Sequence, residues 1–227
     1  MGNGTDAANV RFNAWQFRQI LGRGVHGILL CQAESAGAVR AFVESCRYPH
    51  HSAGVDPNLP SPIERMHGAT REAASGRLGL GTRGRGSEMT AARVWGLSPE
   101  EYMACCDPWP LSPRGELLLG VKLESPEGIV NSEEIIAVPG LGFAEMRPGV
   151  SAFLSATSRS HATPIRRNAA GAGARLCSVR KYHVAFLETA TPESIIAGLD
   201  EGVRVIAGQG ERRRLSGAPT KKRTMPV

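Results

Sequence analysis

Glu124 is well placed for chemistry, because an apolar run that includes Val121 and Leu123 stops directly before it and Ser125-Pro126 follows. This pattern predicts a buried strand that delivers a carboxylate at its carboxyl end. In folds of alternating strands and helices, ligands bind at the carboxyl ends of the strands. A lone glutamate there is as typical of a salt bridge or a helix cap as of a functional site, so both interpretations stay open.

The elements after Glu124 form a unit typical of parallel α/β folds. Asn131 is predicted to cap a short helix, with Glu134 completing a capping box, and the helix ends before Pro139-Gly140. The next strand is predicted at residues 142–146. A strand, a polar turn, a short helix and a second strand follow one another here, as parallel sheets require.

Upstream, two further strands and two helices are predicted. Residues 7–12 form a short strand candidate, Asn13 can cap a helix that follows, and residues 27–31 are a continuous apolar run of strand length. Ser35 is predicted to cap the next helix, whose apolar positions follow the spacing i, i+3, i+4, i+7. Those positions are Val39, Phe42, Val43 and Cys46.

The middle of the chain predicts a long loop at residues 50–97, which have no sustained period. The loop contains the pattern GxGxxG at residues 79–84. Since no strand precedes it and no helix clearly follows, dinucleotide binding is not favoured. Ser98, with proline after it, predicts a capped helix that ends near Cys106.

The last third of the chain is less regular. Residues 147–182 are free of acidic residues and show no clear period. Strands are predicted at 184–188 and 203–207, and a capped helix begins at Thr191 between them.

Six predicted strands, mostly followed by helices, indicate a parallel (β/α) repeat. The fold class predicted is therefore α/β, of the (β/α)₈ TIM-barrel type, with about six of the eight strands present. The two missing units would lie before residue 7. We expect a single partial barrel domain over residues 1–210 and a basic tail over residues 211–227.

Composition favours one soluble domain. At 227 residues and 41% hydrophobic the chain can bury one sizeable core, and 27 glycines with 15 prolines suit a loop-rich α/β protein. No apolar run approaches the roughly 18 residues of a membrane span, and no secretory signal opens the chain. The five cysteines are odd in number and lack CxxC spacing, which favours neither a disulfide framework nor a zinc site. We expect a cytoplasmic protein without a membrane partner.

The net charge of +6 could suggest a nucleic-acid partner. Residues 211–227 carry a net charge of +5 and residues 146–187 a net charge of +7, so the rest of the chain is net acidic. Because the basic residues belong to two segments and not to a face of the fold, we expect a solvated tail and no nucleic-acid partner.

With these segments placed, the sequence resembles the HpcH/HpaI aldolase (citrate lyase-like) family of the phosphoenolpyruvate/pyruvate-binding barrels. The stretches that carry the resemblance are Val10-Arg11, Gly24–Leu30 with Arg47–Pro49, Lys122–Gly128 with Val138–Gly140, and Gly202–Ile206. In addition, Arg83-Gly84 and Arg85-Gly86 match a Gly/Arg loop that follows Arg-Tyr-Pro in the family.

The resemblance implies a metal-dependent carbon–carbon lyase that cleaves or forms a bond beside a 2-oxo acid through a pyruvate or hydroxypyruvate enolate. It implies that Glu124 is a ligand of a divalent metal (Mg²⁺, Mn²⁺ or Co²⁺) that stabilises the enolate. Arg11 would stabilise the enolate oxygen. Lys122, on the same strand face as Glu124, and Gly149 would bind the substrate. A 2-oxo acid, an aldehyde and further copies of the chain are the partners implied.

The sequence departs from the family at several positions. The second metal ligand would fall at Val150, which cannot ligate a hard cation. An aspartate that tunes the general-base histidine would fall at Gly22, and that histidine belongs to a unit missing from this chain. The resemblance fails near Gly149 and resumes near His183, as a shifted and restored reading frame over residues 147–182 would produce. We therefore expect impaired activity.

Two other functions stay open. The chain could be a non-catalytic barrel remnant that pairs with intact homologues, or a nucleic-acid binder that uses its basic segments. Co-purification and size-exclusion test the first, and salt-dependent retention of RNA or DNA tests the second.

Overall fold

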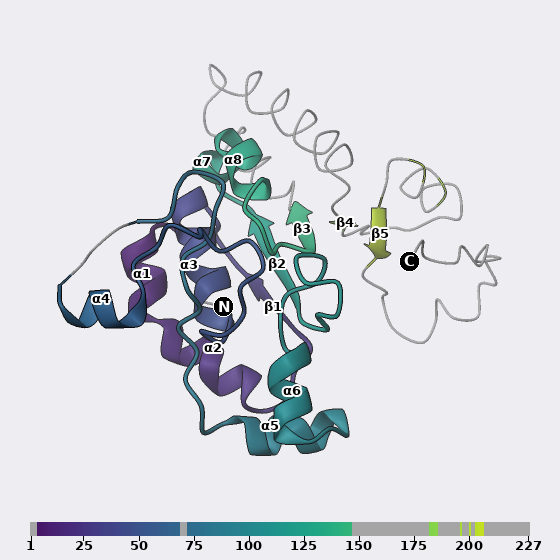
Figure 1. The fold of residues 1–227 in the computed structure, drawn as a ribbon. Coiled ribbons are helices and arrows are strands. Elements are labelled where there is room, and N and C mark those ends of the chain that lie inside the picture. Colours follow the sequence, from purple (N-terminus) through teal and green to yellow (C-terminus); the bar gives the residue numbers. More distant parts are fainter. Residues whose placement is uncertain are drawn as a thin grey trace.

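The computed structural model describes residues 4–68, 72–146, 182–185 and 203–206, together with Ile196 and Asp200. Their strands form one parallel sheet whose spatial order is the chain order (Figure 1). The strands are β1 (Gly27–Leu30), β2 (Leu118–Leu123), β3 (Phe143–Met146), β4 (Tyr182–Ala185) and β5 (Val203–Ile206). The α/β class with parallel strands is confirmed, and the described sheet is a partial one with β1 and β5 at its edges.

The helices are short, and three of them cover one side of the first strands. In Figure 1, α1, α2 and α3 lie together beside β1, β2 and β3, while α7 and α8 lie near the ends of β2 and β3. The described helices are α1 (Ala7–Phe12), α2 (Ala14–Leu21), α3 (Ala36–Cys46), α4 (Pro62–Met66), α5 (Glu88–Trp95), α6 (Pro99–Cys105), α7 (Pro126–Val130) and α8 (Ser132–Ile136).

The core lies between α3 and β2, as their apolar patterns predict. The four spaced positions of α3, from Val39 to Cys46, are fully buried, and so are the apolar residues Leu119, Val121 and Leu123 of β2. Phe42 meets Phe17 of α2 edge to face, with ring centroids 5.1 Å apart. Full burial of each such side chain contributes about 1.5–3 kcal/mol, so the shared apolar core, which includes the side chains of β2, holds this strand in place.

The predicted strand at residues 7–12 is wrong, because this segment is helix α1. The Asp6 side chain caps it by accepting a hydrogen bond from the Asn9 N–H at 2.8 Å. Val10 is the buried residue of α1, and the helix packs on α3. A six-residue segment with one buried position carries no reliable period, so the local cap decided its conformation.

The capping box predicted at Asn131 and Glu134 is also wrong. Ser125 caps α7 by accepting from the Gly128 N–H, and Asn131 makes no side-chain cap. The amide of Asn131 instead donates to the Glu34 carbonyl at 2.8 Å. The cap predicted at Ser98, with proline after it, is confirmed, and the structure adds a capping box with Glu101.

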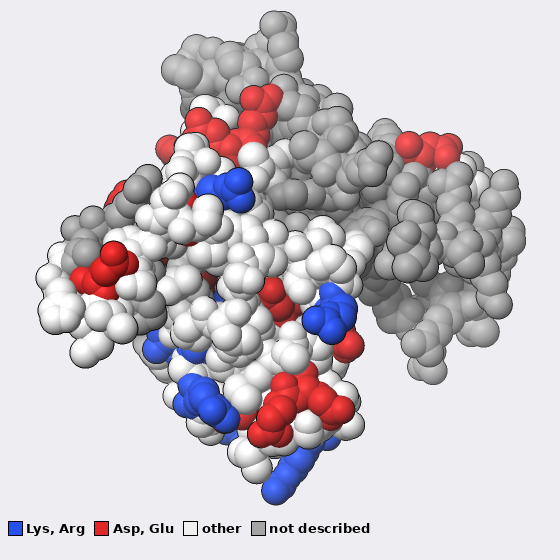
Figure 2. Space-filling view, in the orientation of Figure 1, with Lys and Arg blue, Asp and Glu red and all other residues white. Residues whose placement is uncertain are grey.

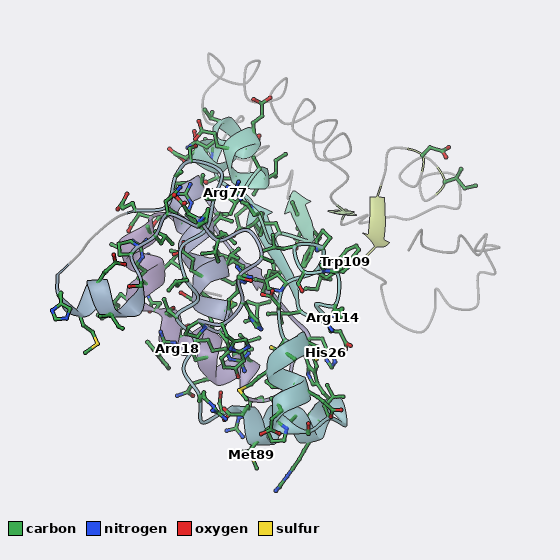
Figure 3. All side chains as sticks on the ribbon, viewed as in Figure 1. Arg18, His26, Arg77, Met89, Trp109 and Arg114 are labelled. Atoms are coloured by element: carbon green, nitrogen blue, oxygen red, sulfur yellow. The ribbon has the colours of Figure 1, made fainter. Side chains whose placement is uncertain are left out.

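The predicted loop at residues 50–97 contains two helices, α4 and α5. Helix α5 buries Glu88, Ala91 and Ala92, which are charged or small and give a weak apolar period. Its last residue, Trp95, stacks on His26 at 4.1 Å (His26 is labelled in Figure 3) and donates its indole N–H to the Gly24 carbonyl. The helix is therefore fixed by contacts with the segment before β1. No helix in the described part of the chain is long and apolar enough to cross a membrane.

Candidate functional site

Three charged side chains meet at the carboxyl ends of β2 and β3. Lys122 lies on β2, Glu124 follows its last residue, and Glu145 lies on β3 in register with Lys122. The ammonium nitrogen of Lys122 is 3.5 Å from Glu124 Oε2 and 3.5 Å from Glu145 Oε1. We call Lys122, Glu124 and Glu145 the strand-end triad.

The strand-end triad is largely shielded from water. The exposed fractions of the Lys122, Glu124 and Glu145 side chains are 14%, 17% and 3%. Residues two apart on a strand share a face, and partners in register lie on adjacent strands about 4.8 Å apart, so the three side chains meet by sheet geometry. One ammonium between two carboxylates leaves a negative site, which favours a further cation.

The loop after β1 supplies the second partner of Glu124. Gln32 has a left-handed φ of 52°, which is unfavourable for a residue with a Cβ, and its backbone N–H donates to Glu124 Oε1 at 3.2 Å. Ala33 donates its N–H to the Lys122 carbonyl at 3.2 Å. Each oxygen of Glu124 therefore faces a donor, and the loop fixes the carboxylate in place.

The predicted site residues are only partly brought together. Lys122 and Glu124 are in contact. Arg11 is exposed on α1, not at a strand end, and within residues 4–68 and 72–146 no ion pair or hydrogen bond joins it to Glu124. Burial raises the pKa of the Glu44 carboxyl on α3, and the nearby Arg11 guanidinium opposes that rise. Gly149, Val150 and the rest of residues 147–181 lie outside the described residues.

The strand-end triad offers oxygen ligands of the kind that hard divalent ions prefer. Carboxylates suit Mg²⁺ and Mn²⁺, and Glu124 and Glu145 supply two of them from adjacent strand ends. Among the described residues no group of three or more His, Cys, Asp and Glu side chains could hold a metal. The chemistry of the two carboxylates fits a divalent ion, while the Lys122 ammonium lies between them.

The Gly/Arg loop matched by the resemblance has a structural role at Arg83. This side chain is fully buried, donates to Tyr102 Oη at 2.8 Å and to Cys106 Sγ at 2.9 Å, and lies 4.6 Å above the ring of Tyr48. Burial raises the pKa of the Tyr48 hydroxyl to about 12. Burial also raises the pKa of the Cys106 thiol, although the nearby Arg83 guanidinium opposes that rise.

The GxGxxG segment uses its backbone N–H groups inside the fold. Gly79 donates to the Glu44 carboxylate at 2.6 Å, and Thr82 and Arg83 donate to the carbonyls of Glu44 and Arg47 at 2.9 Å. Because these three donors already have partners within the chain, they are not free to bind a phosphate.

A second buried network joins Arg47, His51 and Asp107. Arg47 contacts both oxygens of Asp107, and His51 Nδ1 lies 3.2 Å from Asp107 Oδ1. The other ring nitrogen of His51 is 2.8 Å from the Met103 carbonyl. The network ties the end of α3 to the segment after α6, so it supports the fold and lies apart from the strand-end triad in the chain.

His51 is expected to make stability depend on pH. Burial lowers its pKa below the ordinary 6.5, although the Asp107 carboxylate opposes this shift. The unfolded chain then binds more protons than the folded chain, so the free energy of unfolding should fall as the pH drops through about 6.5, by up to about 1.4 kcal/mol per pH unit. Urea denaturation at pH 7.5 and 5.5 measures this. His51→Gln should reduce the fall, and His67→Gln, at an exposed position, should not. A fall that is the same in all three proteins would contradict the assignment.

The visible surface is mixed in charge. In Figure 2, acidic side chains gather near α7 and α8 and near α5 and α6, with basic side chains scattered between them. On this face the described residues therefore form no continuous basic patch of the kind that follows a nucleic-acid backbone.

The comparisons with known proteins rest on structure. No protein-family model and no curated protein sequence matches the chain. The structure is similar to an HpcH/HpaI aldolase from Desulfitobacterium hafniense DCB-2, with 16% identity and a TM-score of 0.54, over 89% of this chain and 64% of that one. It also matches an HpcH/HpaI aldolase/citrate lyase family protein from Burkholderia cenocepacia J2315, with 15% identity and a TM-score of 0.49, over 89% and 73%. Citrate synthase SbnG matches with 16% identity and a TM-score of 0.46, over 88% and 62%.

The chain thus spans less than two thirds of the Desulfitobacterium aldolase. The chain therefore has, in part, the α/β fold of the HpcH/HpaI aldolases.

Proposed function

We propose that the chain is a partial member of the HpcH/HpaI aldolase family and is built for metal-dependent carbon–carbon lyase chemistry on a 2-oxo acid. The observation that carries the proposal is the position of Glu124, a largely shielded carboxylate at the carboxyl end of a central parallel strand. The resemblance in sequence at Lys122–Gly128 and the shared fold support the same family. The substrate class is a hydroxy-oxo acid, which is split to an aldehyde and pyruvate or a close relative.

Each residue of the strand-end triad has a separate role in this proposal. Glu124 holds the divalent ion (Mg²⁺, Mn²⁺ or Co²⁺), which supplies a Lewis acid for the developing enolate. Lys122 supplies a cation for the carboxylate of the 2-oxo acid; a pair of unit charges 4 Å apart near a protein surface interacts by about 4 kcal/mol. Glu145 keeps the Lys122 side chain extended along the strand ends, and the Gln32 N–H orients Glu124.

The remaining roles depend on the sequence alone. Two roles stay predictions: that Arg11 stabilises the enolate, and that Gly149 contacts the substrate. In the structure Arg11 lies on helix α1. Since Val150 has no oxygen in its side chain and Gly22 replaces a tuning carboxylate, we propose that turnover by this chain is strongly impaired. A cytoplasmic homo-oligomer is the assembly proposed.

Mn²⁺ binding by the purified protein tests the proposal. Glu124→Gln keeps the size of the side chain but removes its charge, and should weaken binding by roughly tenfold or more, because a neutral amide is a poor ligand for a hard cation. Glu134→Gln, on the exposed side of α8, is the matched control and should leave the affinity unchanged. The free-ion signal in electron paramagnetic resonance measures both. If Glu124→Gln binds Mn²⁺ as tightly as the unaltered chain, Glu124 is not the ligand.

A non-catalytic role as a binding partner is the second candidate. Phe12, the last residue of α1, and Trp15, near the start of α2, are 82% and 55% exposed, and β1 lies at the edge of the described sheet. Unpaired edges and exposed apolar side chains favour association. Co-elution with an intact homologue, without metal-dependent release of pyruvate, would favour this role over the lyase.

A further inference from the structure

Lys122 occupies the place that a cation would take at the strand-end triad. Its ammonium lies 3.5 Å from an oxygen of Glu124 and 3.5 Å from an oxygen of Glu145, so one positive charge serves both carboxylates. The other Glu124 oxygen accepts the Gln32 N–H at 3.2 Å. A divalent ion that approaches Glu124 therefore meets a carboxylate whose two oxygens already have donors.

The distances set a limit on how far an ion could stand from this ammonium. A divalent ion lies about 2.0–2.6 Å from a carboxylate oxygen, so an ion on Glu124 Oε2 would stand within about 6 Å of the Lys122 nitrogen, given the 3.5 Å contact. Both side chains are shielded from water, and repulsion between like charges is screened much less in such a place than in bulk solvent. A divalent ion and the Lys122 ammonium therefore repel each other, and each weakens the interaction of the other with Glu124.

The contact with Glu145 explains why the Lys122 ammonium remains at the strand ends. The Glu145 side chain is 3% exposed, so loss of the Lys122 ammonium would remove a charge partner that water does not readily replace. Lys122 and Glu145 lie in register on adjacent strands, so the sheet itself holds them in contact. Lys122 can lose its contact with Glu124 while its contact with Glu145 remains. Loss of both contacts would be unfavourable, because Glu145 is buried.

From this arrangement we propose that Lys122 competes with the divalent ion for Glu124, and that Glu145 retains the lysine on its side when an ion binds. This inference rests on the proposed function, in which Glu124 holds the ion. In the metal-free chain the ammonium keeps the two carboxylates together. Ion binding then requires the Lys122–Glu124 contact to break, which makes the affinity of the unaltered chain for divalent ions low.

Mn²⁺ titration of charge variants tests the competition, with the free Mn²⁺ signal as the readout. Lys122→Gln removes the ammonium and should tighten Mn²⁺ binding by roughly tenfold, which corresponds to removing part of a short-range like-charge repulsion. Lys122→Arg keeps the positive charge and should bind as weakly as the unaltered chain. Arg114→Gln removes one exposed positive charge on the loop that precedes β2 (Figure 3), and should leave the affinity unchanged.

The same titration separates this inference from the proposed function. If Lys122→Gln binds Mn²⁺ no more tightly than the unaltered chain while Glu124→Gln binds it less tightly, the competition is refuted and the metal-binding role of Glu124 stands. If Glu124→Gln has no effect, alone or combined with Lys122→Gln, the metal-binding role itself fails, and the competition with it.

Folding of Lys122→Gln is checked by circular dichroism, because the substitution removes a charge partner of the buried Glu145 carboxylate. Lys122→Gln/Glu145→Gln removes both charges and avoids that cost. The double variant should still bind Mn²⁺ more tightly than Glu145→Gln alone, since it lacks the ammonium. Equal affinities in these two proteins would overturn the proposal, whether or not the single variant folds.

Discussion

Replacement of Asp107 by alanine is expected to lower the free energy of unfolding by about 3–5 kcal/mol, because it leaves a buried guanidinium without its carboxylate. Arg47 is fully buried, and Asp107 is 3% exposed. The Arg47 guanidinium donates to the two oxygens of Asp107 at 2.6 and 3.0 Å, a bidentate geometry. After the substitution, the Ala53 carbonyl would be its remaining acceptor among the described contacts.

Chemical denaturation at pH 7.5 measures the effect. Glu134→Ala is the control, since it removes a carboxylate from an exposed position in the first turn of α8 and should cost no more than about 1 kcal/mol. A loss below about 1 kcal/mol for Asp107→Ala would mean that water reaches Arg47 when the carboxylate is removed, and that the network contributes little to the fold.

The parts of the fold that could be predicted are those where one period persists over a whole element. Helix α3 keeps its apolar spacing over 11 residues, and each of the four spaced positions is buried. The run before Glu124 and the segment at 142–146 are strands β2 and β3. In β2 the apolar residues Leu119, Val121 and Leu123 are fully buried, so pattern and burial agree there.

The parts that could not be predicted depend on contacts between distant segments. Helix α1 buries only Val10, so a cap and its packing on α3 outweigh its strand-like composition. Helix α5 buries two alanines and a glutamate, and is fixed by Trp95 against the segment before β1. Neither element has an apolar period strong enough to identify it from the sequence.

The residues around Glu124 also divide into those that could be predicted from the sequence and those that depend on contacts between distant segments. Glu124 could be predicted because it follows a clear strand, and Lys122 because the family resemblance implies a substrate contact at its position, two residues earlier on the same strand face. Glu145 and Gln32 were missed, although they contact these residues, because register between strands and the conformation of one loop residue are tertiary properties. A signal for Glu145 was present: a charged residue inside the short apolar strand 142–146 requires a buried partner.

Replacement of Gly81 by alanine is expected to destabilise the protein by about 2–3 kcal/mol, since there is no room for a Cβ. A Cβ at this position would lie 2.4 Å from the Tyr48 carbonyl oxygen and 2.5 Å from the Arg47 carbonyl oxygen. Both are backbone atoms next to the Arg83–Arg47 hydrogen bond, so neither can move aside without breaking the pairing between the loop and the end of α3. Arg83, which the loop delivers into the core, would shift with it.

Gly84→Ala is the matched control in the same GxGxxG segment. A Cβ at Gly84 meets nothing within 4 Å, and the residue is exposed, so the free energy of unfolding should change by less than about 0.5 kcal/mol. Thermal and chemical denaturation compare the two variants directly. Close packing predicts that only Gly81→Ala is destabilised, whereas a loop that binds a ligand through its glycines without packing on the chain would tolerate both. Equal stabilities for the two variants would therefore contradict the structural role assigned to Gly81.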